Sequence, residues 1–152
     1  MPRAYPETFD QVRLAPPAKR LIAFVYDLLL VMALILVTAL IANLINGGEA
    51  VGGAWWQSTV SIVVYAFYAF FWTRNGQTLG LQSWRLRIQT PEGERPTLVQ
   101  CLLRLILSPI GLAFTILILF WPGQKPRMSW QDTLSGTCMV YLPKPEQRKA
   151  SK

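Results

Sequence analysis

One acidic residue lies inside the first long apolar segment of the chain, and it is the first candidate for chemistry. Asp27 falls within residues 21–45, a run that is otherwise almost entirely apolar. A charge at the centre of a bilayer costs roughly 2.5–3.5 kcal/mol on insertion scales, so this carboxylate should face protein or water and have a partner. Arg20, seven residues earlier, and Thr38, eleven residues later, lie on the same helical face. Two interpretations stay open: an ion pair that fixes the helix, or a carboxylate that titrates or binds an ion.

A second candidate set is a stripe of hydroxyl and aromatic side chains in the next apolar segment. Its members recur at spacings of three and four residues, as expected for one helical face: Ser58, Ser61, Tyr65, Tyr68 and Trp72. The stripe predicts either helix–helix packing through small and polar residues, or hydrogen bonds from Tyr65 and Tyr68 to Asp27 that shape a polar pocket. Arg104, in a third apolar region, is a further candidate partner for Asp27, although on a surface helix it would bind phosphate instead.

The remaining composition excludes several kinds of chemistry. The chain has no histidine, which removes the commonest general base and the usual metal ligand. Cys101 and Cys138 form no C-x-x-C motif, and each lies in an apolar run typical of a buried thiol. The acidic residues lack the spacing of a helical metal site. We therefore expect no enzyme, no cofactor and no metal site.

The net charge of +7 is explained by the positions of the basic residues. They flank the apolar segments, as in anchoring against anionic lipid headgroups, and no motif for reading nucleic acid accompanies them. Four basic residues precede residue 21, four lie between residues 74 and 95, and none lies in the glycine-rich stretch at residues 46–53. We expect two antiparallel crossings, residues 21–45 and 55–72, with the N-terminus in the cytoplasm.

Residues 98–121 are long enough for one crossing, but Arg104 and the Ser108-Pro109 pair interrupt them. One crossing would place the basic C-terminal tail outside, against the positive-inside rule. We therefore favour an interfacial amphipathic helix over residues 97–108, followed by a re-entrant segment from Pro109. A third transmembrane crossing is the alternative, and a cytoplasmic C-terminus fits the former.

A small paired β-structure is predicted beside the helices. Residues 84–89 alternate between apolar and basic or polar side chains, which predicts a strand, and residues 137–142 form a second candidate strand. We expect them to pair at the cytoplasmic surface. The fold class is thus an all-α membrane protein with a hairpin-like strand pairing. It divides into a cytoplasmic segment (1–19), a membrane domain (20–142) and a basic cytoplasmic tail (143–152).

Three short motifs in order resemble those of the RDD family. They are K-R-L-I-A-F-V-Y-D at residues 19–27, G-Q-T-L-G at 76–80 and Q-D-T-L-S-G-T at 131–137. The resemblance covers residues 18–142 and implies a bacterial inner-membrane protein. It also suggests transport of an undefined ligand, with cation/proton antiport proposed for some relatives. It further implies a contact between Arg20 and Asp132, although Asp132 could instead be a turn or capping residue. The motif positions Gly76, Thr78, Gly80, Gly136 and Thr137 are candidate functional turns, and the glycines could be plain turn residues.

Two functions follow as hypotheses. The first is a transporter in which Asp27 is the coupling carboxylate. Because two crossings cannot enclose a pathway, this function requires a homo-oligomer. The second is a structural or accessory subunit, in which Arg20, Asp27 and Asp132 hold the fold and the basic surface binds anionic lipid or a partner membrane protein.

Overall fold

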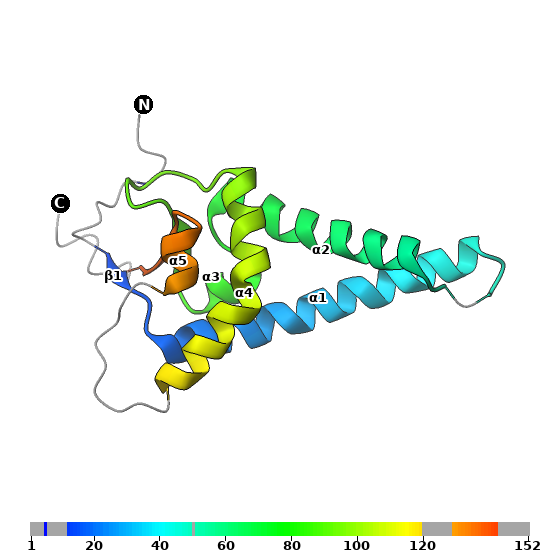
Figure 1. Cartoon of the computed structure of the whole chain (residues 1–152), viewed down its shortest axis with the longest axis horizontal. Coiled ribbons are helices and arrows are strands. Elements are labelled where there is room, and N and C mark those ends of the chain that lie inside the picture. Colours follow the sequence, from blue (N-terminus) through cyan, green and yellow to red (C-terminus); the bar gives the residue numbers. More distant parts are fainter. Residues whose placement is uncertain (1–4, 6–11, 50, 120–128, 143–152) are drawn as a thin grey trace.

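Two long antiparallel helices form most of the length of the molecule. The computed structural model describes residue 5 and residues 12–49, 51–119 and 129–142. Helix α1 (Pro17–Ile45) and helix α2 (Ala54–Asn75) run side by side toward a loop at the far end (Figure 1). Proline suits the first turn of α1, where its missing N–H is not needed. Gly76 ends α2 in the left-handed conformation, with φ of 68°.

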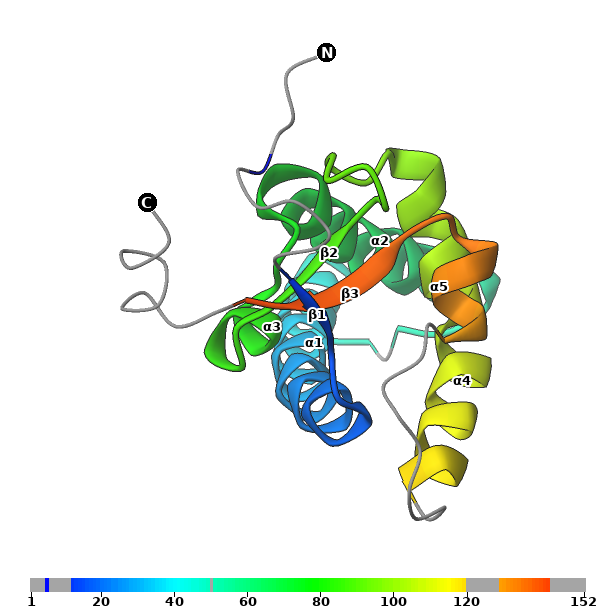
Figure 2. The same cartoon turned by 90° about the vertical axis from the view of Figure 1, so that its left-hand side faces the viewer.

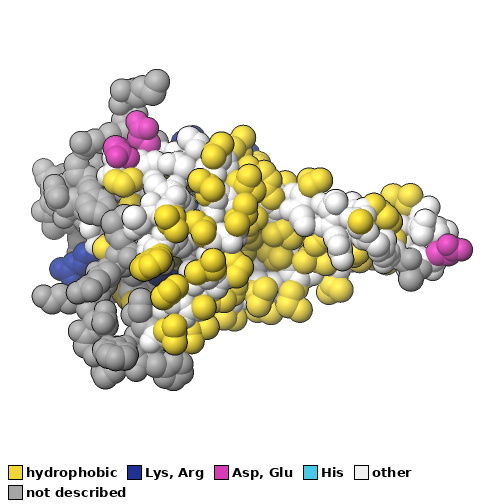
Figure 3. All heavy atoms as spheres, in the orientation of Figure 1, with side chains coloured by type: hydrophobic (Ala, Val, Ile, Leu, Met, Phe, Trp, Pro, Cys, Tyr) yellow, Lys and Arg dark blue, Asp and Glu magenta, His cyan; other side chains and the backbone are white. Residues whose placement is uncertain are grey.

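The outer half of this hairpin exposes large apolar side chains. Leu36 is 68% exposed, Leu44 72% and Ile45 82%. Figure 3 shows hydrophobic side chains spread over the visible surface of the molecule. A surface of this kind is stable only against lipid or other apolar helices.

Two helices among the described residues are long and apolar enough to cross a membrane: Pro17–Ile45 and Leu98–Leu117. Helix α2 has a similar length, but its tryptophans, tyrosines and hydroxyl residues make it less apolar, and it falls short of the same criterion. The crossing expected at residues 55–72 therefore stays a prediction.

Helix α4 (Leu98–Leu119) is continuous, and this corrects the expected break at Ser108-Pro109. Proline removes one backbone donor from the helix, yet the Ser108 hydroxyl donates to the Arg104 carbonyl at 2.8 Å and the helix continues. No re-entrant turn occurs within its described length. The helix lies across the α1–α2 hairpin at a steep angle (Figures 1 and 2).

A three-stranded antiparallel sheet covers the end of the hairpin where α1 begins (Figure 2). Its strand order is β1 (Arg13–Leu14), β3 (Cys138–Tyr141) and β2 (Leu86–Gln89). The expected pairing of β2 with β3 is confirmed, with Gln89 opposite Cys138. Strand β1 was not predicted, and it draws residues before position 20 into the fold.

The predicted basic face of β2 does not lie open to solvent. Arg87 and Gln89 are buried, and the Arg87 guanidinium stacks over the Tyr5 ring at 4.0 Å. Arg85 lies outside the strand with φ of 55°. Two short helices complete the fold: α3 (Leu79–Ser83) against α1, and α5 (Trp130–Leu134) against α4.

Candidate functional site

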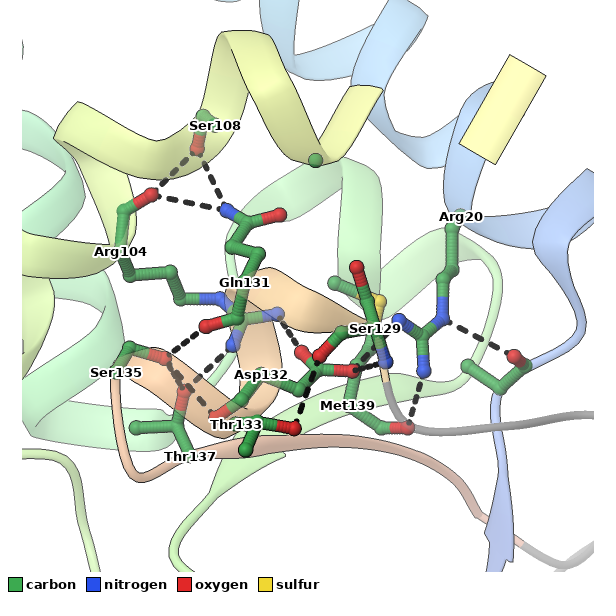
Figure 4. Close-up of polar contacts among 12 residues, drawn as sticks. Arg20, Arg104, Ser108, Ser129, Gln131, Asp132, Thr133, Ser135, Thr137 and Met139 are labelled. Atoms are coloured by element: carbon green, nitrogen blue, oxygen red, sulfur yellow. Dashed lines mark hydrogen bonds and ion pairs between the residues drawn. The ribbon is translucent and has the colours of Figure 1, made fainter. Parts of the chain in front are cut away.

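A buried ion cluster joins the start of α1, the middle of α4 and the short helix α5. One oxygen of Asp132 accepts from Arg20 at 2.7 Å, and the other lies 2.8 Å from a terminal nitrogen of Arg104 (Figure 4). The Asp132 side chain is fully buried, and those of Arg20 and Arg104 are 10% and 3% exposed. The contact between Arg20 and Asp132 expected from the motifs is therefore present. Arg104 completes a three-residue cluster in which two cations share one carboxylate.

Local hydrogen bonds fix Asp132 in this position. Ser129 precedes α5, and its side chain and that of Asp132 form a capping box, with the Ser129 N–H donating to Asp132 at 3.2 Å. The capping role considered from the sequence and the ion-pair role thus belong to the same carboxylate. Arg104 also donates to Thr137 at 2.5 Å, which brings the last residue of the D-T-L-S-G-T motif into the cluster.

Burial alone would raise the pKa of Asp132, but Arg104 and Arg20 outweigh it and hold the pKa below its ordinary value. The neighbouring Cys138 thiol has its pKa raised to about 11, by burial first and by the charge of Asp132 second. The cluster thus keeps Asp132 ionised, while Cys138 is a poor source of thiolate at neutral pH.

A second buried carboxylate, Asp27, lies on α1 two turns after Arg20. Asp27 accepts hydrogen bonds from the Thr78 hydroxyl at 2.5 Å and from the Gly80 backbone N–H at 3.0 Å. Helix α3 approaches α1 so closely that a Cβ on Gly80 would lie 2.5 Å from the Ala23 carbonyl oxygen. Gly80 is therefore a close-contact residue rather than a plain turn glycine. All the donors that the structure gives Asp27 are neutral.

Several residues that the sequence placed around Asp27 make other contacts. Arg20 pairs with Asp132, although it lies on the expected face of α1. Tyr65 donates to the Leu98 carbonyl at 3.1 Å, and Thr38 donates to the Leu34 carbonyl of its own helix. Arg104 binds Asp132 and Thr137, so the expected contact with Asp27 or with phosphate is replaced by internal contacts.

The other motif positions have conformational roles. Gly76 and Gly136 have φ of 68° and 61°, which favour glycine at both turns. A Cβ on Gly76 would also lie 2.5 Å from the Ile88 carbonyl oxygen, so this turn packs directly against β2. Gly76 and Gly136 are therefore turn glycines, which is one of the two roles considered for them from the sequence.

A cavity of about 110 Å³ is lined by Asp27 and by both arginines that pair with Asp132. Arg20, Arg104 and Asp27 are the charged side chains that line it within the described ranges. Tyr68 also lines the cavity, so one of the two tyrosines expected to shape a polar pocket at Asp27 lies beside it. Apolar side chains of α1 and α4 form much of the remaining wall: Leu21, Phe24, Leu105 and Leu112.

Sequence reasoning missed two residues at this cavity. Gln131 donates from one amide nitrogen to the Arg104 carbonyl at 2.9 Å and to the Ser108 hydroxyl at 2.8 Å, and so ties α5 to α4 (Figure 4). Trp72 is 5% exposed, and its indole Nε1 is buried with no hydrogen-bond acceptor in the described part of the chain. The amphipathic helix expected over residues 97–108, which includes Arg104 and Ser108, gave a signal for the first contact. Trp72 was read only as packing within its own stripe.

Within the described ranges, no group of three or more cysteine, aspartate or glutamate side chains is placed to hold a metal ion. The cavity therefore offers guanidinium groups, one carboxylate, an indole N–H and a phenol. This set can bind a polar ligand or exchange a proton.

The long apolar helices, the lipid-type surface and the buried polar cluster define a small helical membrane protein. Comparison with protein families matches residues 14–136 to the RDD family, a family of membrane proteins. The match covers most of the chain, and this chain belongs to the RDD family. No curated protein and no solved structure matches it.

Proposed function

We propose that this protein is a proton-coupled transporter of a bacterial inner membrane, in which Asp27 carries the proton. The observation that carries the proposal is the setting of Asp27. It is a buried carboxylate on a membrane-type helix, its donors are the neutral groups of Thr78 and Gly80, and it borders a cavity. A carboxylate held by neutral donors can release and regain a proton without breaking an ion pair. The permanent charges Arg20 and Arg104 are held by Asp132 instead.

The sheet supports one orientation for both ends of the chain. Strand β1 follows the N-terminal segment, strand β3 precedes the C-terminal tail, and the two are hydrogen-bonded neighbours. In the proposed orientation both strands lie on one side of the membrane, and the positive-inside rule favours the cytoplasm as that side. In this orientation the ion cluster lies at the cytoplasmic end of α1.

A homo-oligomer follows from the shape of the helix hairpin. One pair of helices cannot enclose a pathway, and the apolar faces of α1 and α2 are free to pack against further copies within the membrane. The coupled solute is a cation exchanged for protons or another small ligand.

The test is proton movement in vesicles that contain a pH-sensitive dye and the purified protein. Sodium, lithium and potassium salts, and then small organic solutes, are added in turn to wild type and to Asp27→Asn at equal protein content. We expect a solute-dependent pH change in the wild type that disappears in Asp27→Asn. The matched control is Glu49→Gln in the exposed loop after α1, which should behave as wild type. A flux that persists in Asp27→Asn would contradict the assignment of Asp27.

A structural or accessory role is the second candidate, and helix α4 favours it. The helix buries Arg104 toward the sheet and turns large apolar side chains outward, among them Leu103, Ile106 and Ile110. A helix of this kind that lies across the hairpin suits the plane of the membrane interface, beside anionic lipid or a partner membrane protein. If no solute moves protons through well-inserted wild type, this role is preferred, and bound lipid and co-purifying partners become the measurements.

A further inference from the structure

The net charge of the groups around the cavity depends on whether Asp27 is ionised or protonated. Among the described residues, the charged groups that line the cavity together with Asp27 are Arg20 from α1 and Arg104 from α4. Tyr68 is the titratable group that α2 contributes, and α3 contributes the neutral Gly80 N–H. Asp132 forms ion pairs with both arginines and does not itself line the cavity. Two guanidinium groups and two carboxylates make the set neutral when Asp27 is ionised, and one positive charge remains when Asp27 is protonated.

Among the described residues, the donors around the cavity exceed the acceptors. A guanidinium has five N–H donors, and the described contacts of Arg20 use three of them: those to the Ala15 carbonyl, to Asp132 and to the Met139 carbonyl. Those of Arg104 use two, toward Thr137 and Asp132. Unused guanidinium donors beside an apolar wall are a setting that an anion satisfies.

Trp72 is the independent observation that points to a ligand. Its ring is buried at the cavity wall and packs on Tyr68, with ring centroids 4.9 Å apart. Its Nε1–H is buried and has no acceptor in the described part of the chain. A buried donor without an acceptor is destabilising, and a ligand that supplies the acceptor removes this cost.

The size and walls of the cavity limit the ligand. One water requires roughly 10–15 Å³ of such space, so about 110 Å³ has room for on the order of eight water-sized groups. The apolar side chains Leu21, Phe24 and Leu112 face one part of this space. The fitting ligand is a single anionic head with a short apolar body.

We propose that this cavity binds a small organic monoanion, a carboxylate or sulfonate with a short apolar chain, together with one proton on Asp27. The inference rests on the proposed function and names its substrate class. The anion accepts from Trp72 and from the free N–H groups of the two arginines. Because the anion favours the protonated state of Asp27, proton and anion bind with positive coupling, and each raises the affinity of the site for the other.

The probe is propane-1-sulfonate, which stays anionic across the working pH range, so any proton taken up on binding belongs to the protein. Binding is measured by titration calorimetry on protein in zwitterionic-lipid nanodiscs, in buffers of different ionisation enthalpy and at several pH values. We expect uptake approaching one proton per ligand at high pH and an affinity that falls up to about tenfold per pH unit as Asp27 ionises. The cation propylammonium and neutral propan-1-ol should bind far more weakly.

Three variants separate the contributions. Asp27→Asn should bind propane-1-sulfonate with little pH dependence and without proton uptake, because the neutral side chain mimics the protonated acid. Trp72→Phe should weaken binding about three- to tenfold through loss of one hydrogen bond. Trp55→Phe, at an exposed tryptophan of the same helix, should match wild type.

The outcomes separate the inference from the proposed function. No binding of propane-1-sulfonate to monodisperse wild type, equal binding of propylammonium, or no effect of Trp72→Phe would overturn the anion site. Asp27-dependent proton flux without sulfonate binding would leave the transport proposal intact and reject this inference. Sulfonate binding with proton uptake but without proton flux would support the anion site and reject the transport proposal. Competition by anionic lipid in the nanodisc would support the same anion site with a lipid headgroup as its source.

Discussion

Replacing Asp132 with asparagine should be among the most damaging conservative changes in this protein. Asparagine keeps the size of the side chain and an oxygen that can accept the Ser129 N–H, so the change removes mainly the negative charge. Arg20 and Arg104 then remain buried as cations without a carboxylate. The variant therefore measures the electrostatic contribution of the cluster rather than its packing.

The magnitude follows from the burial of all three groups. Removing one partner of a buried ion pair costs about 3–5 kcal/mol, because the remaining charge loses its compensation. Native proteins are stable by only about 5–15 kcal/mol, so this is a large share of the total. At roughly 2–4 °C per kcal/mol for a chain near this length, the unfolding midpoint should fall by on the order of 10 °C.

The assay is heating of detergent-solubilised protein, followed by size-exclusion chromatography with fluorescence detection of the remaining monodisperse fraction. Glu92→Gln is the control, because Glu92 is an exposed acid outside the cluster and its loss should change stability by less than about 0.5 kcal/mol. A midpoint for Asp132→Asn within a few degrees of wild type would refute the reasoning. A double variant with Arg104→Met checks the cause, because removing one unpaired cation should restore part of the lost stability.

Two further predictions concern the packing of α3 and the response of the cluster to acid. Gly80→Ala should lower the unfolding midpoint by several degrees in the same heating assay, because its Cβ would collide with the Ala23 carbonyl oxygen. Gly52→Ala, with open space around it, should leave the midpoint unchanged, and equal midpoints for the two variants would contradict the close contact. Because the pKa of Asp132 is lowered in the folded protein, its ionised form contributes to the free energy of unfolding. This contribution is complete above the unfolded-state pKa of about 3.9 and is lost as pH falls through the folded-state pKa. The difference between the wild-type and Asp132→Asn midpoints should therefore stay constant from pH 7 to about pH 4 and begin to shrink only below about pH 4, and a difference that already shrinks between pH 7 and pH 5 would refute this assignment.

The helices and the β2–β3 pairing could be predicted because their signals are local. An apolar run gives α1, and period-two alternation gives β2. Strand β1 has two residues and carries no periodic signal, so its pairing follows only from the tertiary fold. The break expected at Pro109 was wrong because a single proline in a helix costs one hydrogen bond, and the packing of α4 against the rest of the fold outweighs it.

The site was predictable where a motif recorded a distant contact and unpredictable where only spacing was used. The motifs brought Arg20 and Asp132 together across 112 positions. Helical spacing assigned Arg20 to Asp27 because it compares residues of one helix only. The true partner of Asp27 is Thr78, 51 positions away, which reaches α1 through the turn before α3. Periodicity along one helix cannot report such a contact.

The first turns of α1 therefore organise the protein through two separate contacts. Arg20 holds the C-terminal segment through Asp132, and Asp27 holds the connection between α2 and β2 through Thr78 and Gly80. The cavity lies between these contacts and is lined by both α1 residues. Loss of charge at Asp132 leaves two buried cations unpaired, whereas loss of charge at Asp27 leaves neutral donors that an amide can still satisfy. The same Asp-to-Asn change should thus lower stability at Asp132 and leave the fold intact at Asp27, so that the two variants separate the structural role of Asp132 from the proton-carrying role proposed for Asp27.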